Sequence, residues 1–290
     1  MDKKTQSRII SGVMNWGEWG ENLSVNEMAE LIEFNLEKGI NTFDQADIYG
    51  GYTTEKQFGK AFKSSGVERT KIKLITKCGI QYPCESKSFK IKHYDYSPQH
   101  IRFSVENSLK NLKTEYIDVF LLHRPSPLMN ANEIAEVISK LKNDGKIKEF
   151  GVSNFTESQI KLIKKNIPVD FNQIECSLTN NECFSNGIVD FCQTENINLM
   201  AWSPLGSYFK IKDNTTNRIK PIIEKLSNKY SCSVDQLLLS WVMKHPASII
   251  PVIGTTKKER ILASIKSINI SLDSLDWFSL LEASTGKRVA

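Results

Sequence analysis

The sequence lacks the cysteine and histidine patterns that mark metal sites and thiol redox sites. None of its six cysteines belongs to a CxxC pair, which argues against both kinds of site. In a chain of 290 residues we interpret these cysteines as reduced, mostly buried thiols. No two histidines are four residues apart, so the helical metal-binding pair is also missing; they are His93, His100, His123 and His245. We therefore expect no metal ion.

Long hydrophobic runs and clusters of charge are missing as well. No apolar segment approaches the roughly 20 residues of a membrane-spanning helix, and the first residues lack the apolar core of a secretory signal. The formal charge of +5 comes from lysines spread along the chain, whereas a nucleic-acid-binding surface concentrates its positive charge. We therefore expect a cytoplasmic protein with neither a membrane nor a nucleic acid as partner.

No segment rich in proline, glycine and serine divides the chain, so residues 1–290 are expected to form one domain. Short β-branched segments alternate with helical patterns, which predicts parallel strands joined by helical crossovers. Eight such units match an α/β fold of the closed (β/α)8 TIM barrel type. The predicted strands are residues 8–14, 41–46, 71–77, 117–123, 147–153, 169–175, 198–203 and 248–254.

The helical patterns agree with this alternation. In residues 24–39, Ser24 can cap the start of a helix and Gly39 can end it. Two patterns precede the last strand, so one of them is an addition to the basic barrel. A doubly wound open sheet is the alternative, but its G-x-G-x-x-G fingerprint does not fit the glycines at positions 12, 17 and 20. The remaining helical patterns are residues 54–66, 97–113, 131–145, 156–166, 217–230, 233–245, 257–267 and 271–286.

Four chemically reactive side chains fall at the carboxyl ends of three successive strands, where barrel enzymes carry their active sites. Asp44 and Tyr49 follow the second strand, Lys77 ends the third and His123 ends the fourth. Each alone has an ordinary interpretation, such as a solvated strand end, a loop aromatic or a buried histidine. Because the strands are neighbours, we expect the four side chains to converge on one pocket.

Together these residue types suit proton transfer to an oxygen atom. A tyrosine has a pKa near 10 and exchanges protons poorly at neutral pH unless its phenolate is stabilised. A nearby lysine ammonium provides that stabilisation, a buried aspartate holds the lysine, and a histidine polarises a carbonyl. Protein side chains supply no hydride, so reduction of the carbonyl carbon implies a nicotinamide cofactor.

Two aspartates in the segment FDQADIYGG compete for the role of the buried acid. Side chains alternate along a strand, so Asp44 shares the barrel interior with Thr42, while Phe43 faces the helices. Asp47 lies beyond the strand and is interpreted as a turn or cap residue. Asp44 is therefore the acid expected to pair with Lys77.

The motifs FDQADIYGG, LITKCG, LLHRP, GVSNF, NQIECS, AWSPLG and VIGTTKKERI follow one another over essentially the whole chain. In this order they resemble the aldo-keto reductase superfamily, and in particular its bacterial oxidoreductase branch. The resemblance implies NADP-dependent reduction of an aldehyde or ketone to the alcohol, and the reverse oxidation. Tyr49 would be the general acid, Lys77 and Asp44 would lower its pKa, and His123 would position the carbonyl.

The resemblance also implies how the cofactor binds. Ser153 and Asn154 would bind the nicotinamide carboxamide with Gln173 beside them, and Trp202 would stack on the ring. A lysine often found beside the 2′-phosphate is replaced by Gly254, so NADPH is expected, with NADH as the alternative. The full set of expected cofactor-binding residues is Gly12, Val13, Met14, Asp44, Ser153, Asn154, Gln173, Trp202, Ser203, Pro204, Leu205, Gly206, Gly254, Thr255, Thr256, Lys257, Arg260 and Ser264.

The expected partner is a small carbonyl substrate, contacted by Trp16, Trp19, Tyr82 and Arg124. Arg124 stands where the family usually has an aromatic residue, and either faces the barrel exterior or favours an anionic substrate. Two alternatives to the reductase remain open: a nicotinamide-binding sensor or regulatory subunit with little turnover, and a lyase or isomerase that uses Lys77 as a Schiff base. The sequence indicates neither the physiological substrate nor the oligomeric state.

Overall fold

The computed structural model describes residues 7–289. Within this range eight parallel strands close into a barrel in the order β1-β10-β9-β8-β7-β6-β3-β2. All eight predicted strands are present, and the (β/α)8 barrel is confirmed. The strands are β1 (Ile10–Gly12), β2 (Thr42–Asp44), β3 (Lys73–Cys78), β6 (Ile117–Leu122), β7 (Ile147–Ser153), β8 (Phe171–Glu175), β9 (Asn198–Trp202) and β10 (Ile250–Ile253).

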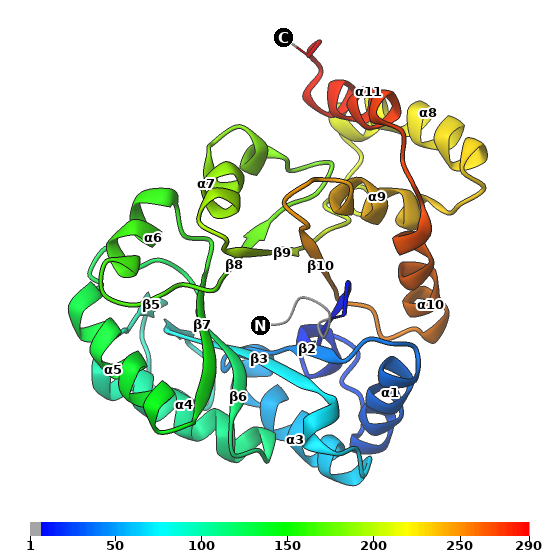
Figure 1. Cartoon of the computed structure of the whole chain (residues 1–290). Coiled ribbons are helices and arrows are strands. Elements are labelled where there is room, and N and C mark those ends of the chain that lie inside the picture. Colours follow the sequence, from blue (N-terminus) through cyan, green and yellow to red (C-terminus); the bar gives the residue numbers. More distant parts are fainter. Residues whose placement is uncertain (1–6, 290) are drawn as a thin grey trace.

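Helices surround the barrel (Figure 1). The first of them begins with the predicted cap: Ser24 accepts from the Glu27 amide and the Glu27 carboxylate accepts from Ser24. Gly39 follows its end with a φ of 85°, which favours glycine. The helices are α1 (Val25–Glu37), α2 (Tyr49–Tyr52), α3 (Thr54–Ser64), α4 (Pro98–Leu112), α5 (Ala131–Asn143), α6 (Glu157–Lys164), α7 (Ile188–Thr194), α8 (Asn214–Lys229), α9 (Val234–Met243), α10 (Lys258–Lys266) and α11 (Ser274–Thr285).

The additional helix is α8, which packs against α11 outside the ring of barrel helices (Figure 1). The sequence pattern did not predict α7, nor a short antiparallel hairpin formed by β4 (Ile80–Gln81) and β5 (His93–Tyr94). Segments of seven and two residues are shorter than the windows over which helical periodicity and strand alternation can be recognised. None of the described helices is both long enough and apolar enough to cross a membrane.

Apolar side chains fill the barrel interior and the layer between strands and helices. The interior cluster includes Ile75, Leu121 and Phe171. Phe43 instead packs outward with Phe58 of α3, as the alternation along β2 predicts. Full burial of side chains of this size stabilises the fold by about 1.5–3 kcal/mol each. The packed interior leaves polar residues at the carboxyl end of the barrel.

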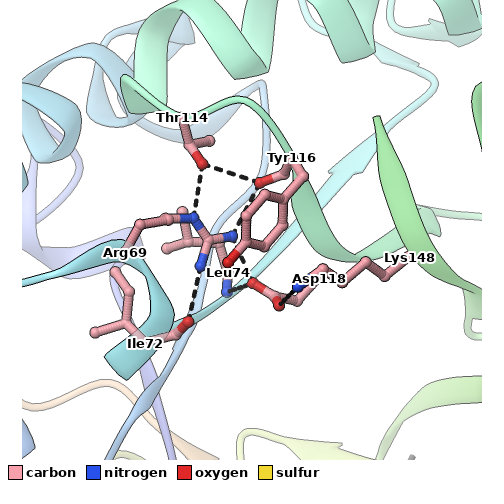
Figure 2. Close-up of polar contacts among 7 residues, drawn as sticks. All are labelled: Arg69, Ile72, Leu74, Thr114, Tyr116, Asp118 and Lys148. Carbon is pink, nitrogen blue, oxygen red and sulfur yellow. Dashed lines mark hydrogen bonds and ion pairs between the residues drawn. The ribbon is translucent and has the colours of Figure 1, made fainter. Parts of the chain in front are cut away.

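A polar cluster joins the amino-terminal ends of β3, β6 and β7 (Figure 2). It lies at the end of the barrel opposite the carboxyl ends of the strands. Arg69 donates to Asp118 at 2.5 Å, and Asp118 also accepts from the Leu74 amide at 3.0 Å. The ring of Tyr116 lies between two cations, with the Arg69 guanidinium 3.9 Å and the Lys148 ammonium 3.6 Å from its centroid. These contacts fix the strands that carry Lys77 and His123 at their other ends.

Candidate active site

The four side chains predicted to converge do lie together at the carboxyl end of the barrel. The Lys77 ammonium, which is fully buried, donates to Asp44 Oδ2 at 2.7 Å, to the Gln45 carbonyl at 2.7 Å and to the Tyr49 hydroxyl at 3.2 Å. The His123 ring stands edge-on to Tyr49, with ring centroids 6.1 Å apart. Asp44 is therefore the acid that pairs with Lys77.

The backbone around Tyr49 turns sharply to bring the phenol over the barrel. Tyr49 begins α2, and Gly50 and Gly51 follow with φ values of 59° and 63°. These left-handed conformations favour glycine, so the pair permits the tight turn from β2 into α3 that the sequence indicates. Tyr52 adopts φ 75°, which is uncommon for a side chain of its size.

The second oxygen of Asp44 is held by a residue from the opposite side of the barrel. Gln173 on β8 donates from Nε2 to Asp44 Oδ1 at 2.9 Å. Both carboxylate oxygens of Asp44 therefore have donors, which offsets much of the cost of burying the charge. The sequence predicts Gln173 beside the nicotinamide, but it does not predict the hydrogen bond from Gln173 to Asp44.

Burial and charge set the protonation states of this group. Burial opposes the charge on Lys77, but Asp44 and Tyr49 outweigh it and the pKa of Lys77 is raised. Burial raises the pKa of Tyr49, and Lys77 counteracts this effect only in part. The charge of Asp44 also raises the tyrosine pKa, which corrects the expectation that Asp44 lowers it. At neutral pH the Tyr49 hydroxyl therefore carries a proton that it can donate.

His123 is neutral for a similar reason. Burial lowers its pKa well below the ordinary value, and the charges of Lys77 and Arg124 act in the same direction. Its Nδ1 has no hydrogen-bond partner among the described residues. A neutral imidazole beside a phenol can orient an oxygen atom without adding a further charge to the pocket.

Asp47 lies in the turn after β2, as interpreted from the sequence, but it is buried. Its side chain is 7% exposed, and Oδ1 has no hydrogen-bond partner among residues 7–289. Burial raises the pKa of Asp47 well above its ordinary value, and the nearby Glu55 raises it further. The carboxyl of Glu55 is also buried and has a raised pKa, although it accepts a bond from Thr76 at 2.7 Å.

The raised pKa makes the charge on Asp47 a cost to stability. The penalty is absent below the ordinary pKa of 3.8 and grows as the pH rises above it, because the unfolded chain releases the proton first. We expect Asp47→Asn to increase the free energy of unfolding more at pH 8 than at pH 5, by about 1.4 kcal/mol for each pH unit between 5 and 8 that lies below the raised pKa of Asp47. Urea unfolding at the two pH values measures this difference.

A gain that is equal at both pH values, or a loss at pH 8, would contradict this assignment. Carbonyl reductase activity provides a second comparison between the two acids. An activity loss in Asp47→Ala as large as that in Asp44→Ala would mean that Asp47 is the functional acid.

The residues expected to hold a nicotinamide form one connected row across β7, β8 and β9. The indole Nε1 of Trp202 donates to Asn154 Oδ1 at 2.8 Å, and Asn154 donates from Nδ2 to Ser153 Oγ at 2.8 Å. Ser153 in turn donates to the Gln173 carbonyl at 2.9 Å. Amide and hydroxyl groups beside an aromatic face fit a flat ring that bears a carboxamide.

Backbone geometry marks the same region. Asn154 and Ser203 have φ values of 60° and 50° directly after β7 and β9, a conformation that costs energy in non-glycine residues and clusters at ligand sites. Gly206 has φ 57°, and an added Cβ would lie 2.0 Å from the Thr179 hydroxyl. Pro204 is buried, and Leu205 is partly buried and packs on the core.

Residues near β1 and β10 form the other end of the expected cofactor path. Val13 is buried in the core and donates its amide to the Asp44 carbonyl at 3.0 Å, whereas Met14 is exposed at the rim. Gly12 is buried within β1. The Asn15 side chain donates to the Gly254 carbonyl at 3.2 Å and so links the two loops.

The basic residues after β10 are exposed. Lys257 lies 4.0 Å from Glu21, while the guanidinium of Arg260 has no ion-pair partner among the described residues. Thr255 accepts from the Lys257 amide at 3.2 Å, and Thr256 is half-buried. An exposed and unpaired guanidinium suits a phosphate group.

Ser264, which is expected at the adenosine end of the cofactor, lies on α10. It is buried on α10, and its hydroxyl donates to the Arg260 carbonyl at 2.8 Å. The hydroxyl is thus used within the helix, and a direct contact with the adenosine end does not follow from this geometry.

The four residues expected to contact substrate separate into two groups. Trp16 is fully buried against Phe43 and Phe58, so its prediction as a pocket residue is corrected: the indole belongs to the core. Trp19 is 38% exposed, with its ring centroid 6.2 Å from that of Tyr49 and 5.2 Å from that of Tyr82.

Arg124 lies beside Trp202, at one end of the expected nicotinamide row. Its guanidinium carbon lies 5.2 Å from the centroid of the Trp202 ring, and its charge influences both Tyr49 and His123. Of the two positions expected for Arg124, the barrel exterior is therefore excluded. Trp19 and Tyr82 thus lie beside Tyr49, and Trp202 lies beside the Arg124 guanidinium.

Comparisons with known proteins identify the family of the chain. The model of the aldo/keto reductase family matches residues 8–284. The uncharacterized oxidoreductase YcsN of Bacillus subtilis is 41% identical over 286 residues, covering 97% of this chain and 95% of the relative. The 6-dehydroglucose reductase of Agrobacterium fabrum is 36% identical over 292 residues, covering 100% of this chain and 98% of the relative.

A solved structure shows the same fold. The aldo/keto reductase from Klebsiella pneumoniae, in complex with NADP and acetate, matches with a TM-score of 0.77 at 22% identity, covering 95% of this chain and 94% of that one. The family match spans nearly the whole chain, and the two relatives above exceed 30% identity over almost their full lengths. The chain therefore belongs to the aldo/keto reductase family.

Proposed function

We propose that this protein catalyses the NADPH-dependent reduction of an aldehyde or ketone to the alcohol, and the reverse oxidation. The observation that carries the proposal is the buried chain of contacts from Asp44 through Lys77 to the Tyr49 hydroxyl. When bound, the dihydronicotinamide would supply the hydride. NADP is present in the Klebsiella pneumoniae structure, and the unpaired Arg260 supports NADPH over NADH here.

In this proposal side chains of the protein orient and protonate the carbonyl oxygen of the substrate. The neutral His123 imidazole orients the carbonyl oxygen toward the phenol, and Tyr49 transfers its proton as negative charge develops on that oxygen. Lys77 stabilises the resulting phenolate across the 3.2 Å contact, and Asp44 keeps the lysine in place. Ser153, Asn154 and Trp202 would hold the nicotinamide.

The geometry favours this role of Lys77 over a Schiff base. The ammonium makes three contacts, its pKa is raised, and the side chain is fully buried. A Schiff-base lysine needs a free amine, which usually requires a lowered pKa. Borohydride trapping of an aldehyde on Lys77 should therefore give no adduct.

The position and positive charge of the Arg124 guanidinium favour a substrate that carries an anionic group in addition to the carbonyl. A guanidinium in a partly buried pocket binds a carboxylate through charge-assisted hydrogen bonds. We expect Arg124→Ala to lower kcat/KM for 4-carboxybenzaldehyde about tenfold while changing that for 4-nitrobenzaldehyde much less. Arg124→Lys, which keeps the charge, should lose less than the alanine variant.

An equal change for both aldehydes would contradict the anionic-substrate assignment but leave the reductase proposal intact. A panel of carbonyl compounds, monitored by NADPH oxidation, tests the reaction itself. Sugar aldehydes belong in that panel because one relative bears the name 6-dehydroglucose reductase.

A further inference from the structure

The segment between β3 and α4 carries the β4–β5 hairpin and ends at a buried tyrosine, Tyr96, that contacts the loop after β6. Tyr96 is 6% exposed. Its hydroxyl donates to the Arg124 carbonyl at 2.5 Å and accepts from the Arg124 amide at 3.1 Å. A single side-chain hydroxyl thus binds both polar backbone groups of the residue that follows His123.

These backbone groups need such a partner because Arg124 lies beyond the end of β6. The preceding residue, His123, is still held by β3, since its amide donates to the Cys78 carbonyl at 2.9 Å. Pro125 follows and has no amide hydrogen to donate. Without the Tyr96 hydroxyl, a partly buried amide and carbonyl would lose this partner, which is costly.

The ring of Tyr96 is fixed as firmly as its hydroxyl. Gly79 has φ 107°, and a Cβ added there would lie 2.0 Å from the Tyr96 ring. The Asp95 amide donates to the Gly79 carbonyl at 2.9 Å, which ties the two ends of the hairpin segment together. Burial raises the pKa of Tyr96 well above its ordinary value, so the hydroxyl keeps its proton.

A second tyrosine connects the same hairpin to the Tyr49 loop. The Tyr52 hydroxyl donates to the Ile80 carbonyl at 3.3 Å and accepts from the Tyr82 amide at 2.8 Å. Ile80 belongs to the same apolar cluster as Tyr49. The hairpin thus contacts both loops of the site, and Tyr96 provides the contact on the His123–Arg124 side.

We propose that Tyr96 is a positioning residue for carbonyl reduction, which sets the orientation of His123 and Arg124 through the backbone of Arg124. It touches neither the substrate nor the cofactor. The proposal rests on the proposed reductase function. In this proposal the hairpin, through the Tyr96 hydroxyl, fixes the orientation of the His123 imidazole and the Arg124 guanidinium toward the substrate.

Tyr96→Phe tests the proposal because it removes the hydroxyl and keeps the ring beside Gly79. We expect kcat/KM for 4-carboxybenzaldehyde to fall about tenfold, with a smaller loss for 4-nitrobenzaldehyde and an unchanged Kd for NADPH. Tyr94→Phe is the matched control, since Tyr94 lies on β5 and packs on the core clusters. The control should retain wild-type selectivity.

A double-mutant cycle shows whether Tyr96 acts through Arg124. In an Arg124→Ala background, Tyr96→Phe should no longer change the ratio of kcat/KM values for the two aldehydes. If the change in that ratio persists there, or if Tyr96→Phe lowers kcat/KM for both aldehydes equally, the action of Tyr96 through the Arg124 side chain is overturned, and its action on His123 is decided by the NMR signals of the imidazole. A purely structural role would lower stability and activity without altering the ratio.

One readout does not need turnover. The imidazole nitrogen NMR signals of His123, assigned with a His123→Gln variant, should shift in folded Tyr96→Phe and stay unchanged in Tyr94→Phe. Unchanged signals would overturn the positioning role even in an active enzyme. A wild-type protein that turns over no carbonyl compound would instead contradict the proposed function, while a shift of these signals would still support the positioning of His123 by Tyr96.

Discussion

Replacing Tyr49 with phenylalanine is expected to lower carbonyl reduction by a factor of about 10² to 10⁴ without loss of the fold. The variant removes the proposed proton donor but keeps the ring, which belongs to an apolar cluster with Ile48 and Ile80. Lys77 loses one of its three contacts and retains those with Asp44 and the Gln45 carbonyl. The loss should appear in kcat, while the Kd for NADPH remains close to the wild-type value.

Steady-state kinetics with 4-nitrobenzaldehyde and fluorescence titration with NADPH measure the two quantities. Tyr116→Phe is a suitable control because Tyr116 lies on the opposite face of the barrel, between Arg69 and Lys148 (Figure 2). A Tyr49→Phe variant with near-wild-type kcat would eliminate this phenol as the proton donor.

Removal of the buried ammonium is expected to have a second large effect, on stability as well as on activity. Lys77→Met leaves the Asp44 carboxylate, which is 3% exposed, without its ion-pair partner. Breaking one side of a buried pair typically costs about 3–5 kcal/mol. The phenolate of Tyr49 also loses its stabilising charge, so activity should fall together with stability.

The double variant Asp44→Asn/Lys77→Met separates these effects. Removing both charges eliminates the unpaired carboxylate, so most of the lost stability should return while activity stays low. Urea unfolding gives the free energies, and NADPH oxidation gives the rates. If Lys77→Met were as stable as the wild type, the buried ion pair between Lys77 and Asp44 would not contribute as described. If the double variant recovered activity, Lys77 would have no role in the mechanism.

The sequence predicted the barrel and the main site contacts because both depend on local patterns. The strand segments and their alternation with helices specify which residues lie at the carboxyl ends. Side-chain alternation along β2 then separates Asp44, which points inward, from Phe43, which packs outward. These inferences need no knowledge of loop conformation.

The features that the sequence did not predict depend on contacts between distant segments. Trp16 follows β1 just as a pocket residue would, and only its packing against Phe43 and Phe58 places it in the core. The bond from Gln173 to Asp44 crosses the barrel. The two-residue strands β4 and β5 are too short for a periodic signal, so the position of Tyr96 beside Arg124 was also missed.

The most direct test of the account is the stoichiometry of turnover by the wild-type protein. NADPH is incubated with 4-nitrobenzaldehyde or methylglyoxal, and the alcohol formed and the NADPH consumed are both quantified. We predict one alcohol for each NADPH oxidised. Tight NADPH binding without alcohol formation, across a broad panel of aldehydes and ketones, would contradict the account and favour a cofactor-binding sensor or regulatory subunit.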